Sequence, residues 1–455
     1  MERKYYDLSA AQKILLLSQK YTLHKQVNNV CTSILMDTEL DFEMLKKAIQ
    51  KAYERNDSLR VRLIKLDKEI KQYFLENEEP YIGYLDFRGK SLEEMENKLY
   101  KLASKPITGF EKQLSKVYML HSFDGRCGIY FAVSHMILDS WAITTFFKDV
   151  LAVYDSLINH TDLPKPLYSY EELLIKDLDY KNTEAYKKDL EFWEKTLNIS
   201  EPIFTDVNGV SVLEKYRAKH KNPNLRYAPI FSLFTKAKNV MLPVPKELVV
   251  SMEAFCTSNK LPMQSLVLLA YSNYFSKVNN KENDISIHTV VARRGTLKEK
   301  NSGGTRVHFM PLRIILKGDH TFKEGCEIIS EKQNEIYRHS SISPLEVMDL
   351  WHKLFNIPQI GTYLSTALTF QPVKLVAPNG VRIETKWYGN GAAANPLYLT
   401  VMDGDGTGSL KFYYEYQTHR ISFDTVQRLH AHMIKVFETG TSNPEVTIDA
   451  LLNIN

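Results

Sequence analysis

The feature that most constrains the fold is a strand with no polar face. Residues 130–133 read Tyr-Phe-Ala-Val, and four consecutive apolar positions are typical of a strand that is covered on both faces. The segments 116–122 and 127–133 flank an Asp-Gly pair, which favours a β-hairpin. After a short turn at 134–140, apolar residues recur every three or four positions as far as residue 158, which predicts a long helix. We therefore expect a sheet with helices on its faces.

Helices and strands alternate along the rest of the chain. Near the N-terminus the pattern predicts a helix at 10–20, a strand at 29–36 and a helix that starts at Asp41. Residues 204–238 carry many basic residues and an Asn-Pro-Asn segment, which indicate an irregular surface loop. In the second half we expect helices at 186–197, 246–260, 262–277 and 423–438, and strands at 285–292, 307–316, 366–371, 397–403 and 410–416.

Two prolines mark a boundary inside the chain. Pro164 and Pro166 interrupt any regular element, so we expect an N-terminal lobe at 1–165 and a C-terminal lobe at 166–455. A length of 455 residues is consistent with two or three domains. The predicted fold class is mixed α/β, of the α+β type, because most of the strands do not follow a βαβ order.

Composition excludes several classes of protein. The chain has 58 Lys and Arg against 54 Asp and Glu, and a net charge of +4 is too small to indicate a nucleic-acid partner. No apolar stretch approaches the roughly 20 residues of a membrane span, and the N-terminus lacks an apolar signal core. The four cysteines are far apart, which argues against a disulfide scaffold or a zinc site and for a reducing compartment. We therefore expect a cytoplasmic protein with no metal site and no membrane contact.

The turn at 134–140 is the strongest candidate for a catalytic site. It puts His135 at the end of the buried strand and Asp139 directly before the long helix. Asp139 or Ser140 can cap that helix, whose free N–H groups favour negative charge nearby. An imidazole titrates near neutral pH, so His135 can take a proton from an amine or hydroxyl that attacks an acyl carbon. The Asp139 carboxylate can orient the ring, or bind an arginine and fix the turn.

The spacing of His135 and Asp139 is weak support by itself. One other pair, His320 and Glu324, has the same separation, and two such pairs are about what chance predicts for 13 histidines and 54 acidic residues. In a purely structural interpretation, His135 is a buried residue bonded to the backbone and Asp139 only caps the helix. The surrounding motifs have to decide between the two interpretations.

Seven motifs in a fixed order supply that context. Together they resemble the condensation domains of nonribosomal peptide synthetases, within the chloramphenicol-acetyltransferase-like superfamily of acyltransferases. The resemblance spans residues 5–440. The motifs are Leu8-Ser9-Ala10-Ala11-Gln12, similar to LSxxQ; residues 55–63, similar to RHExLRTxF; residues 134–140, similar to HHxxxDG; residues 192–197, similar to YWxxxL; Arg294 with residues 304–313, similar to GR…GxFVNTLPLR; residues 343–346 with Phe370-Gln371; and the strand Tyr414-Glu415-Tyr416 with its following helix.

The resemblance implies two related lobes that form a V-shaped pseudo-dimer with a central tunnel. His135 matches the second, catalytic histidine of the family motif and would stand at the middle of the tunnel. Asp139 matches the motif aspartate, which in the family is chiefly structural and paired with an arginine; the candidates here are Arg55 and Arg60. The other motifs imply tunnel-lining positions at Trp193, Arg294, His308 and Gln371.

The chain departs from the family pattern at several positions. Ser134 replaces the first histidine of the motif, which is a supporting position, and Ser140 replaces its glycine. The Ser140 hydroxymethyl group would project toward the catalytic chamber, where it would crowd the acceptor or hydrogen-bond to it. Arg306 and His308 replace the Phe and Asn of the FVN segment, so the chamber wall differs as well. Proton transfer by His135 remains possible.

These expectations indicate a condensation-type acyltransferase that forms an amide, or less readily an ester. The donor would be an acyl or aminoacyl thioester on the phosphopantetheine of a carrier protein or on coenzyme A, the acceptor an amine, and no permanently bound cofactor is required. The carrier would act in trans, because the chain has no adenylate-forming signature and no Gly-Gly-x-Ser carrier site. The pseudo-dimer that the resemblance implies within one chain favours a monomer. Two alternatives stay open: a non-catalytic module that recruits a carrier protein or an enzyme, and an ester-forming transferase that uses acyl coenzyme A.

The basic residues within 215–226 also allow two interpretations. They are either a solvated loop or a docking surface for an acidic carrier protein, where charge would speed the encounter.

Overall fold

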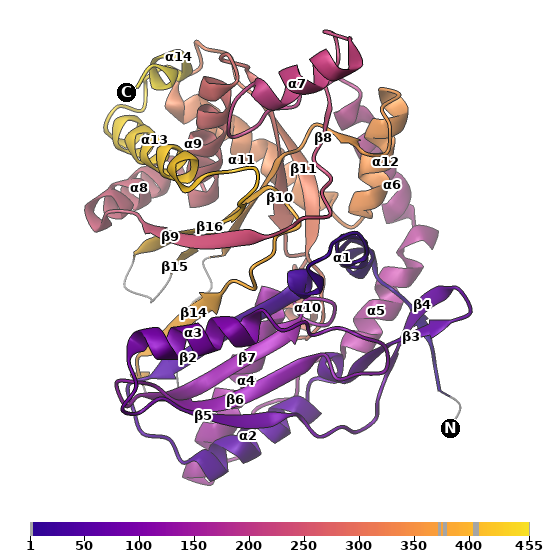
Figure 1. Ribbon diagram of the computed structural model, residues 1–455, viewed down its shortest axis with the longest axis vertical. Helices are drawn as coiled ribbons and strands as arrows, with labels where there is room; N and C mark the ends of the chain where they lie inside the picture. The colour runs from indigo at the N-terminus through magenta and orange to yellow at the C-terminus, as the bar shows by residue number, and fades with distance from the viewer. Residues whose placement is uncertain (1–2, 372–374, 376–379, 404–408, 455) are drawn as a thin grey trace.

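Two large sheets with their own helices form most of the protein (Figure 1), and the described residues also form a three-stranded and a two-stranded sheet. The computed structural model describes residues 3–371, 375, 380–403 and 409–454. A five-stranded sheet lies in the lower part of Figure 1, and a six-stranded sheet lies above it. The architecture is mixed α/β, which confirms the predicted fold class.

The lower sheet is built mainly by the N-terminal half of the chain. Its strands, in spatial order, are β14 (Ile383–Tyr388), β2 (Asn29–Met36), β7 (Cys127–Ser134), β6 (Ser115–His121) and β5 (Ile82–Asp86). Helix α3 (Leu92–Ala103) covers one face, where the Tyr130 hydroxyl donates to Leu99 O at 3.0 Å. Helix α4 (Ser140–Asn159) covers the other, where the Phe131 and Phe146 ring centroids are 4.9 Å apart. The apolar strand is therefore buried on both sides, as predicted.

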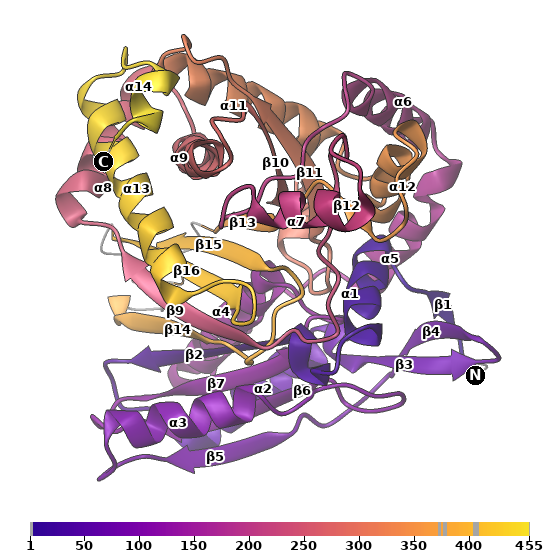
Figure 2. The ribbon, with the colours of Figure 1, turned by 45° about the horizontal axis from the view of Figure 1, so that its top comes forward.

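The remaining elements of this half frame the sheet. Helix α2 packs against α4, and a small antiparallel sheet of β1, β4 and β3 lies at one end (Figure 2). Their bounds are β1 (Tyr6–Asp7), α1 (Ala10–Lys20), α2 (Phe42–Glu54), β3 (Val61–Leu66), β4 (Glu69–Phe74) and α5 (Tyr170–Asp179). Helix α6 (Glu184–Leu197) packs instead in the core of the other half, where Trp193 and Leu197 are buried.

The upper sheet belongs to the C-terminal half. Its strands, in spatial order, are β11 (His308–Ile315), β10 (Asp284–Val291), β13 (Thr366–Gln371), β15 (Leu397–Asp403), β16 (Leu410–Gln417) and β9 (Ala237–Pro243). The helices on its outer face are α8 (Lys246–Asn259), α9 (Met263–Val278), α11 (Phe322–Arg338) and α13 (Phe423–Ser442). The Phe412 ring of β16 packs on Phe437 of α13, with centroids 6.2 Å apart. The opposite face of β9, β16 and β15 is turned toward the N-terminal lobe (Figure 1).

Helices begin where side chains can cap them. Ser9 and Gln12 form a capping box at α1, and the Asp41 carboxylate accepts from two N–H groups of α2. The hairpin of β6 and β7 is antiparallel, with Val117 opposite Phe131. The predicted helices at 10–20 and from Asp41, and the predicted strand at 29–36, are confirmed.

The prediction of an irregular loop over 204–238 is wrong for its middle part. Residues Ser211–His220 form helix α7, and a short strand β8 (Ala228–Pro229) follows. Leu213 of α7 is buried together with Phe204 and Ala228 in a small apolar cluster. One buried leucine gives so weak a periodic signal that basic composition outweighs it. The basic residues predicted in a loop therefore start on the last turns of α7.

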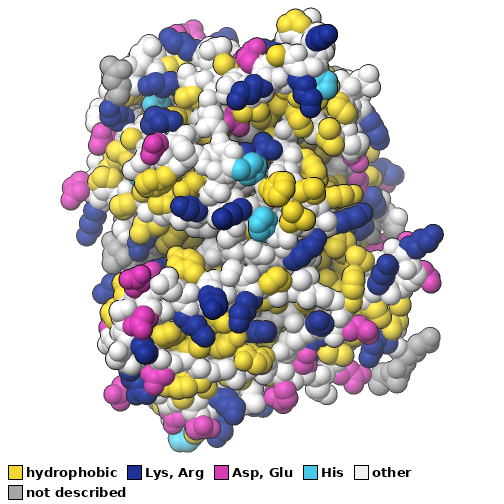
Figure 3. All heavy atoms as spheres, viewed as in Figure 1, with side chains coloured by type: hydrophobic (Ala, Val, Ile, Leu, Met, Phe, Trp, Pro, Cys, Tyr) yellow, Lys and Arg dark blue, Asp and Glu magenta, His cyan; other side chains and the backbone are white. Residues whose placement is uncertain are grey.

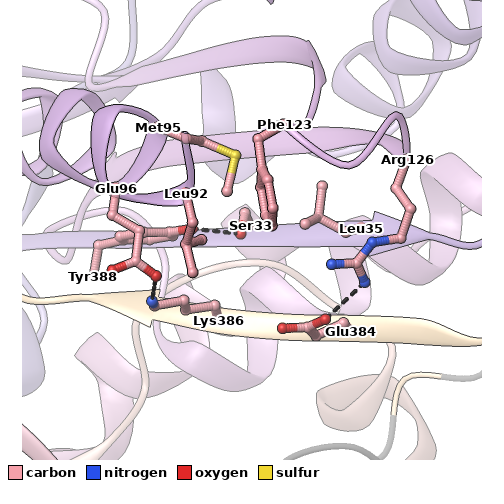
Figure 4. Close-up of a pocket in the computed structure, with 10 residues that line it drawn as sticks. All are labelled: Ser33, Leu35, Leu92, Met95, Glu96, Phe123, Arg126, Glu384, Lys386 and Tyr388. Atoms are coloured by element: carbon pink, nitrogen blue, oxygen red, sulfur yellow. Dashed lines mark hydrogen bonds and ion pairs between the residues drawn. The ribbon is translucent and has the colours of Figure 1, made fainter. Parts of the chain in front are cut away.

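Strand β14 joins the two halves, because it belongs to the sequence range 166–455 but pairs with β2 of the lower sheet. Figure 4 shows its side chains beside those of the N-terminal lobe: Arg126 Nη1 is 2.7 Å from Glu384, and Lys386 forms an ion pair with Glu96. A small pocket between these pairs is lined also by Met95 and Phe123. The N-terminal core thus contains residues from beyond position 165, among them Ile383 and Tyr388.

The surface mixes all kinds of side chain. Figure 3 shows Lys and Arg side chains on both sides of the boundary between the lobes. None of the helices within the described ranges combines the length and hydrophobicity needed to cross a bilayer. All four cysteines are buried free thiols.

Further elements of the C-terminal half are short or lie at its edge. They are α10 (Leu297–Lys300), α12 (Pro344–Leu354), β12 (Gly361–Thr362) and α14 (Ile448–Leu452).

Candidate active site

The turn between β7 and α4 is buried except at one histidine, His135. Of the two candidate caps, Asp139 and Ser140, Asp139 is the N-cap of α4, and its carboxylate accepts from Ala142 N at 2.8 Å. The His135 N–H donates to Asn28 O at 2.7 Å, which fixes the turn against the start of β2. From the end of β7 to Asp139, His135 is partly exposed and every other residue is buried. His135 is therefore the one residue of this segment that keeps some exposure, and its neighbours are packed.

Asp139 forms a buried ion pair that joins the two lobes. Arg294 Nη2 lies 3.0 Å from both carboxylate oxygens, and the arginine and aspartate side chains are 1% and 0% exposed, respectively. The Arg306 N–H donates to Asp139 Oδ2 at 2.9 Å. A buried charge that lost its partner would cost several kcal/mol. The pair and its hydrogen bonds therefore hold the loop 294–306 of the C-terminal lobe against the turn.

Two glycines let that loop approach the N-terminal lobe. A Cβ at Gly303 would lie 2.0 Å from Ser58 Oγ. At Gly304 the φ angle is +87°, and a Cβ would lie 2.1 Å from the Tyr170 ring. The next residue, Thr305, donates its hydroxyl hydrogen bond to His135 O. The loop thus contacts the turn at both His135 and Asp139, and only glycine fits where it crosses.

The environment of His135 keeps its imidazole neutral. Burial lowers the pKa of His135 below its ordinary value of 6.5, and the Asp139 carboxylate opposes this shift without cancelling it. Among the described residues, no partner hydrogen-bonds to the buried Nδ1 atom. A neutral imidazole can accept a proton, so the ring is in the form that a general base requires.

The sequence predicts Arg55 or Arg60 as the partner of Asp139, and this prediction is wrong. The Arg55 guanidinium binds Asp149 of α4 through Nε and Nη2, at 3.1 and 3.0 Å. Arg60 donates to backbone carbonyl oxygens, including Leu75 O at 3.0 Å. Both arginines fasten elements within the N-terminal lobe. Arg294, expected to line a tunnel, is instead the partner of Asp139.

Two further side chains expected to line the tunnel are packed in the C-terminal lobe. Trp193 is 0% exposed and donates from Nε1 to His339 O at 2.8 Å. His308 is also 0% exposed, and its Nδ1 lies 2.8 Å from Ser340 O. Neither side chain has free surface to offer a substrate. Gln371, at the end of β13, is partly exposed and remains a candidate lining residue.

The two serines of the turn differ in their surroundings. Ser134 is buried, and its Oγ accepts from Met136 N at 3.4 Å, so it acts within the turn. Ser140 is partly exposed at the first position of α4, close in sequence to the partly exposed His135.

The opening motif contributes a supporting residue to which the sequence assigns no role. The Gln12 amide donates to Met136 O at 2.9 Å and to Gln72 Oε1 at 2.8 Å, and the Gln12 side chain is fully buried. Through Gln12, the opening motif thus fixes the backbone of the turn at Met136. Its fixed place in the motif order is the signal that could have indicated this contact; Thr305 also lies in a motif, but at a position where the motif specifies no residue type.

Comparisons with known proteins place the whole chain in one family. The family model described as "Condensation domain" matches residues 2–454. The chain is 21% identical over 454 residues to one of the subunits of plipastatin synthase and 23% identical over 463 residues to surfactin synthase subunit 1, both of Bacillus subtilis (strain 168). These alignments cover 99% and 100% of this chain but only 17% and 12% of those proteins. The chain therefore corresponds to one part of each large synthase.

Solved structures share the fold at low sequence identity. The first condensation domain of the calcium-dependent antibiotic synthetase, in complex with a substrate analogue, superposes with a TM-score of 0.81 at 15% identity, over 98% of both chains. The starter condensation domain of rhizomide synthetase, a variant in complex with C8-CoA, gives 0.82 at 17% identity, over 99% of this chain and 98% of that one. With a family model that matches nearly every residue, and with the histidine turn and the loop 294–306 joined by Asp139, this chain belongs to the condensation-domain family.

Proposed function

We propose that this chain is a condensation enzyme that transfers an acyl or aminoacyl group from a pantetheine thioester to an amine and so forms an amide. The observation that carries the proposal is the partly exposed His135 on a turn that both lobes immobilise. Family membership supports the reaction class, and the similar structure with C8-CoA supports a thioester donor.

A single base is sufficient for the proton transfers of this reaction. The amine nitrogen attacks the thioester carbonyl carbon, the C–N bond forms, the C–S bond breaks, and the pantetheine thiol leaves. His135 accepts the proton that the amine gives up and returns it to the departing thiolate. General-base catalysis of this kind contributes about 10²–10⁴-fold. A thioester is already activated, so the reaction requires neither ATP nor a permanently bound cofactor.

The meeting of two lobes at His135 suggests how the substrates arrive. The turn belongs to the N-terminal lobe, and the loop 294–306 that contacts it belongs to the C-terminal lobe. In this proposal the thioester arm and the acceptor enter from opposite sides, through a tunnel between the lobes, and a carrier protein brings the donor in trans. Holding both substrates together supplies much of the remaining rate.

The direct test is His135→Ala. Purified protein is incubated with acyl-pantetheine and acyl-coenzyme A thioesters and a panel of amines and alcohols, and products are measured by mass spectrometry. We expect amide formation by the variant to fall at least tenfold, because the base is lost. His320→Ala is the matched control, since His320 has the same sequence spacing to an acidic residue.

Each outcome selects one function. Amide from wild type and little from the His135 variant supports the proposal. Ester formed only from acyl coenzyme A indicates the ester-forming alternative, and tight carrier binding without any product indicates a recruiting module. Wild-type turnover by the folded His135 variant would reject the role of His135.

A further inference from the structure

The inner face of the upper sheet carries a row of polar side chains that the proposed reaction does not use. Across the strands, His288 of β10, Tyr398 of β15 and Glu415 of β16 occupy one register row, which ends at Asn239 of β9. The helices cover the other face, where Tyr414, next to Glu415 in sequence, is fully buried. Since side chains alternate along a strand, the row points away from the helices and toward the N-terminal lobe.

This face begins beside the histidine turn. The Arg306 N–H binds Asp139, and β11 starts two residues later at His308. Phe309, the next residue, is on the same face as the polar row, and its ring centroid is 5.9 Å from that of Tyr398. Through these contacts the row is continuous with the loop that fixes the candidate base.

The far end of the polar row lies next to β14, the strand that joins the two halves. A Cβ at Gly389, directly after β14, would lie 2.0 Å from Asn239 Oδ1. The next residue, Asn390, donates to Asn29 O at 2.9 Å, and Asn29 pairs with Ser134 at the end of β7. The polar row therefore extends along the contact between the lobes, from the loop 294–306 at one end to β14 at the other.

Glu415 is the unusual member of the row. It is partly exposed, and its carboxylate accepts from Asn239 Nδ2 at 3.2 Å. Within the described part of the chain, no lysine, arginine or histidine forms an ion pair with it. Burial raises the pKa of Glu415 to about 7, and burial together with the nearby Glu415 carboxylate raises the pKa of the neighbouring Tyr398. A carboxylate in such a place lacks the cation that would stabilise its charged form.

Resting on the proposed function, we propose that this face is a subsite for an alkylammonium group on one of the two substrates, which pairs with the Glu415 carboxylate. The Asn239 amide holds the carboxylate in place, and the rings of Tyr398 and Phe309 can pack along the alkyl chain and stabilise the cation over their faces. The ammonium is a second amine, distinct from the one that attacks the thioester.

The test uses matched substrates that differ in one charge. An Nε-dimethyl-lysyl group carries a charged side-chain amine that cannot form an amide, and a norleucyl group is its neutral counterpart. Three arms compare a charged donor with a neutral acceptor, a neutral donor with a charged acceptor, and two neutral substrates. We expect wild type to favour one charged arm roughly ten- to hundredfold in kcat/KM, chiefly through KM, since hydrogen bonds to charged groups have that magnitude. The favoured arm identifies the substrate.

Variants and a binding measurement complete the design. Glu415→Gln keeps the size of the side chain and should lose the preference for the charged substrate. Glu253→Gln removes an exposed carboxylate from α8, on the covered side of the sheet, and should keep it. Isothermal titration with non-reactive pantetheine analogues of the charged and neutral substrates measures the preference without turnover.

The outcomes separate the two proposals. If the neutral arm gives amide but wild type treats charged and neutral substrates alike, the subsite is overturned and the proposed function stands. If no arm gives product, the proposed function fails, and the titration still decides the subsite: equal affinities overturn it, and a preference lost in Glu415→Gln supports it. A preference that survives in the Glu415 variant would also overturn it.

Discussion

Two turns of this protein share one sequence pattern and differ in almost everything else. His135 and Asp139 lie where the lobes meet, whereas His320 and Glu324 lie at the start of α11 near the surface. Asp139 is fully buried against Arg294. Glu324 is exposed, and its carboxylate accepts from Thr321 N, at 2.8 Å, in a capping box.

The difference shows what spacing does and does not encode. In both turns the acidic residue lies near a helix start, where free N–H groups attract it. In the first turn, a loop from the other lobe adds a buried arginine and a hydroxyl that bonds to the histidine carbonyl. In the second, the histidine ring accepts from Lys317 N at 3.2 Å, within its own loop. Tertiary contacts therefore separate a candidate catalytic turn from a helix cap.

The largest effect should come from Asp139→Asn, which preserves a capping group but removes the charge that faces Arg294. A buried guanidinium without its partner should lower the free energy of unfolding by about 3–5 kcal/mol, measured by denaturant titration. Glu324→Gln, at the exposed turn, should change it by less than about 1 kcal/mol. Equal stability of the two variants would mean that the buried pair is not what distinguishes the turns.

The next effect tests the loop that makes the first turn different. Gly304→Ala should cost about 2 kcal/mol or more in unfolding free energy, because a Cβ is strained at φ +87° and overlaps the Tyr170 ring. It should also lower amide formation, since Thr305 would move from His135. Gly125→Ala is a matched control: its φ is +84°, but a Cβ there meets nothing within 4 Å. A cost no greater than that of the control would contradict the steric argument.

A smaller effect is expected at the second turn. Thr321→Ala removes the side chain that caps α11 and should cost about 1 kcal/mol in unfolding free energy. Product formation at saturating substrate should stay at the wild-type level, because this turn lies outside the proposed site. A clear loss of turnover in the folded variant would link the two turns and weaken the comparison.

The smallest effect concerns pH. The base must be neutral, and burial lowers the pKa of His135, so the neutral form persists to pH values below 6.5. The acid limb of the kcat/KM profile should therefore fall below pH 6.5, with activity lost as protons bind and retained as pH rises. The His320→Ala variant should show the same limb. A limb above pH 6.5 would mean that the ring is not held in the environment described here.

Local pattern is a good guide to the elements that position the turn. Four apolar positions at 130–133 predict a strand covered on both faces, and Asp139 before an apolar helical repeat predicts the cap of α4; the structure has both. Both signals depend on neighbours along the chain, since side-chain periodicity and capping act over a few residues. The order of the motifs then indicates the family.

Local sequence patterns do not indicate which residues pair when they are far apart along the chain. The motifs favour Arg55 and Arg60 for Asp139, but Arg294 lies 155 residues away in sequence and pairs with it. The local sequence pattern does not predict strand β14, because its partner β2 is about 350 residues earlier and no local feature indicates that the two strands pair. Trp193 matches a family motif and His308 occupies a motif position where the chain departs from the family, yet both side chains are packed in the core. A motif fixes the identity of a residue, whereas burial depends on what the rest of the chain brings against it.

By itself the sequence determined the strand, the turn, the capped helix and the histidine between them, since each follows from periodicity, capping and motif order within short segments. The tertiary structure decided which arginine neutralises Asp139, which aromatic residues are sealed in the core, and that, among the described residues, a carboxylate on the inner face of the upper sheet has no cation paired with it. The physical reason is that charge pairing and desolvation depend on distance in space. Residues that are hundreds of positions apart in sequence come within these distances only when the folded chain brings the two lobes together.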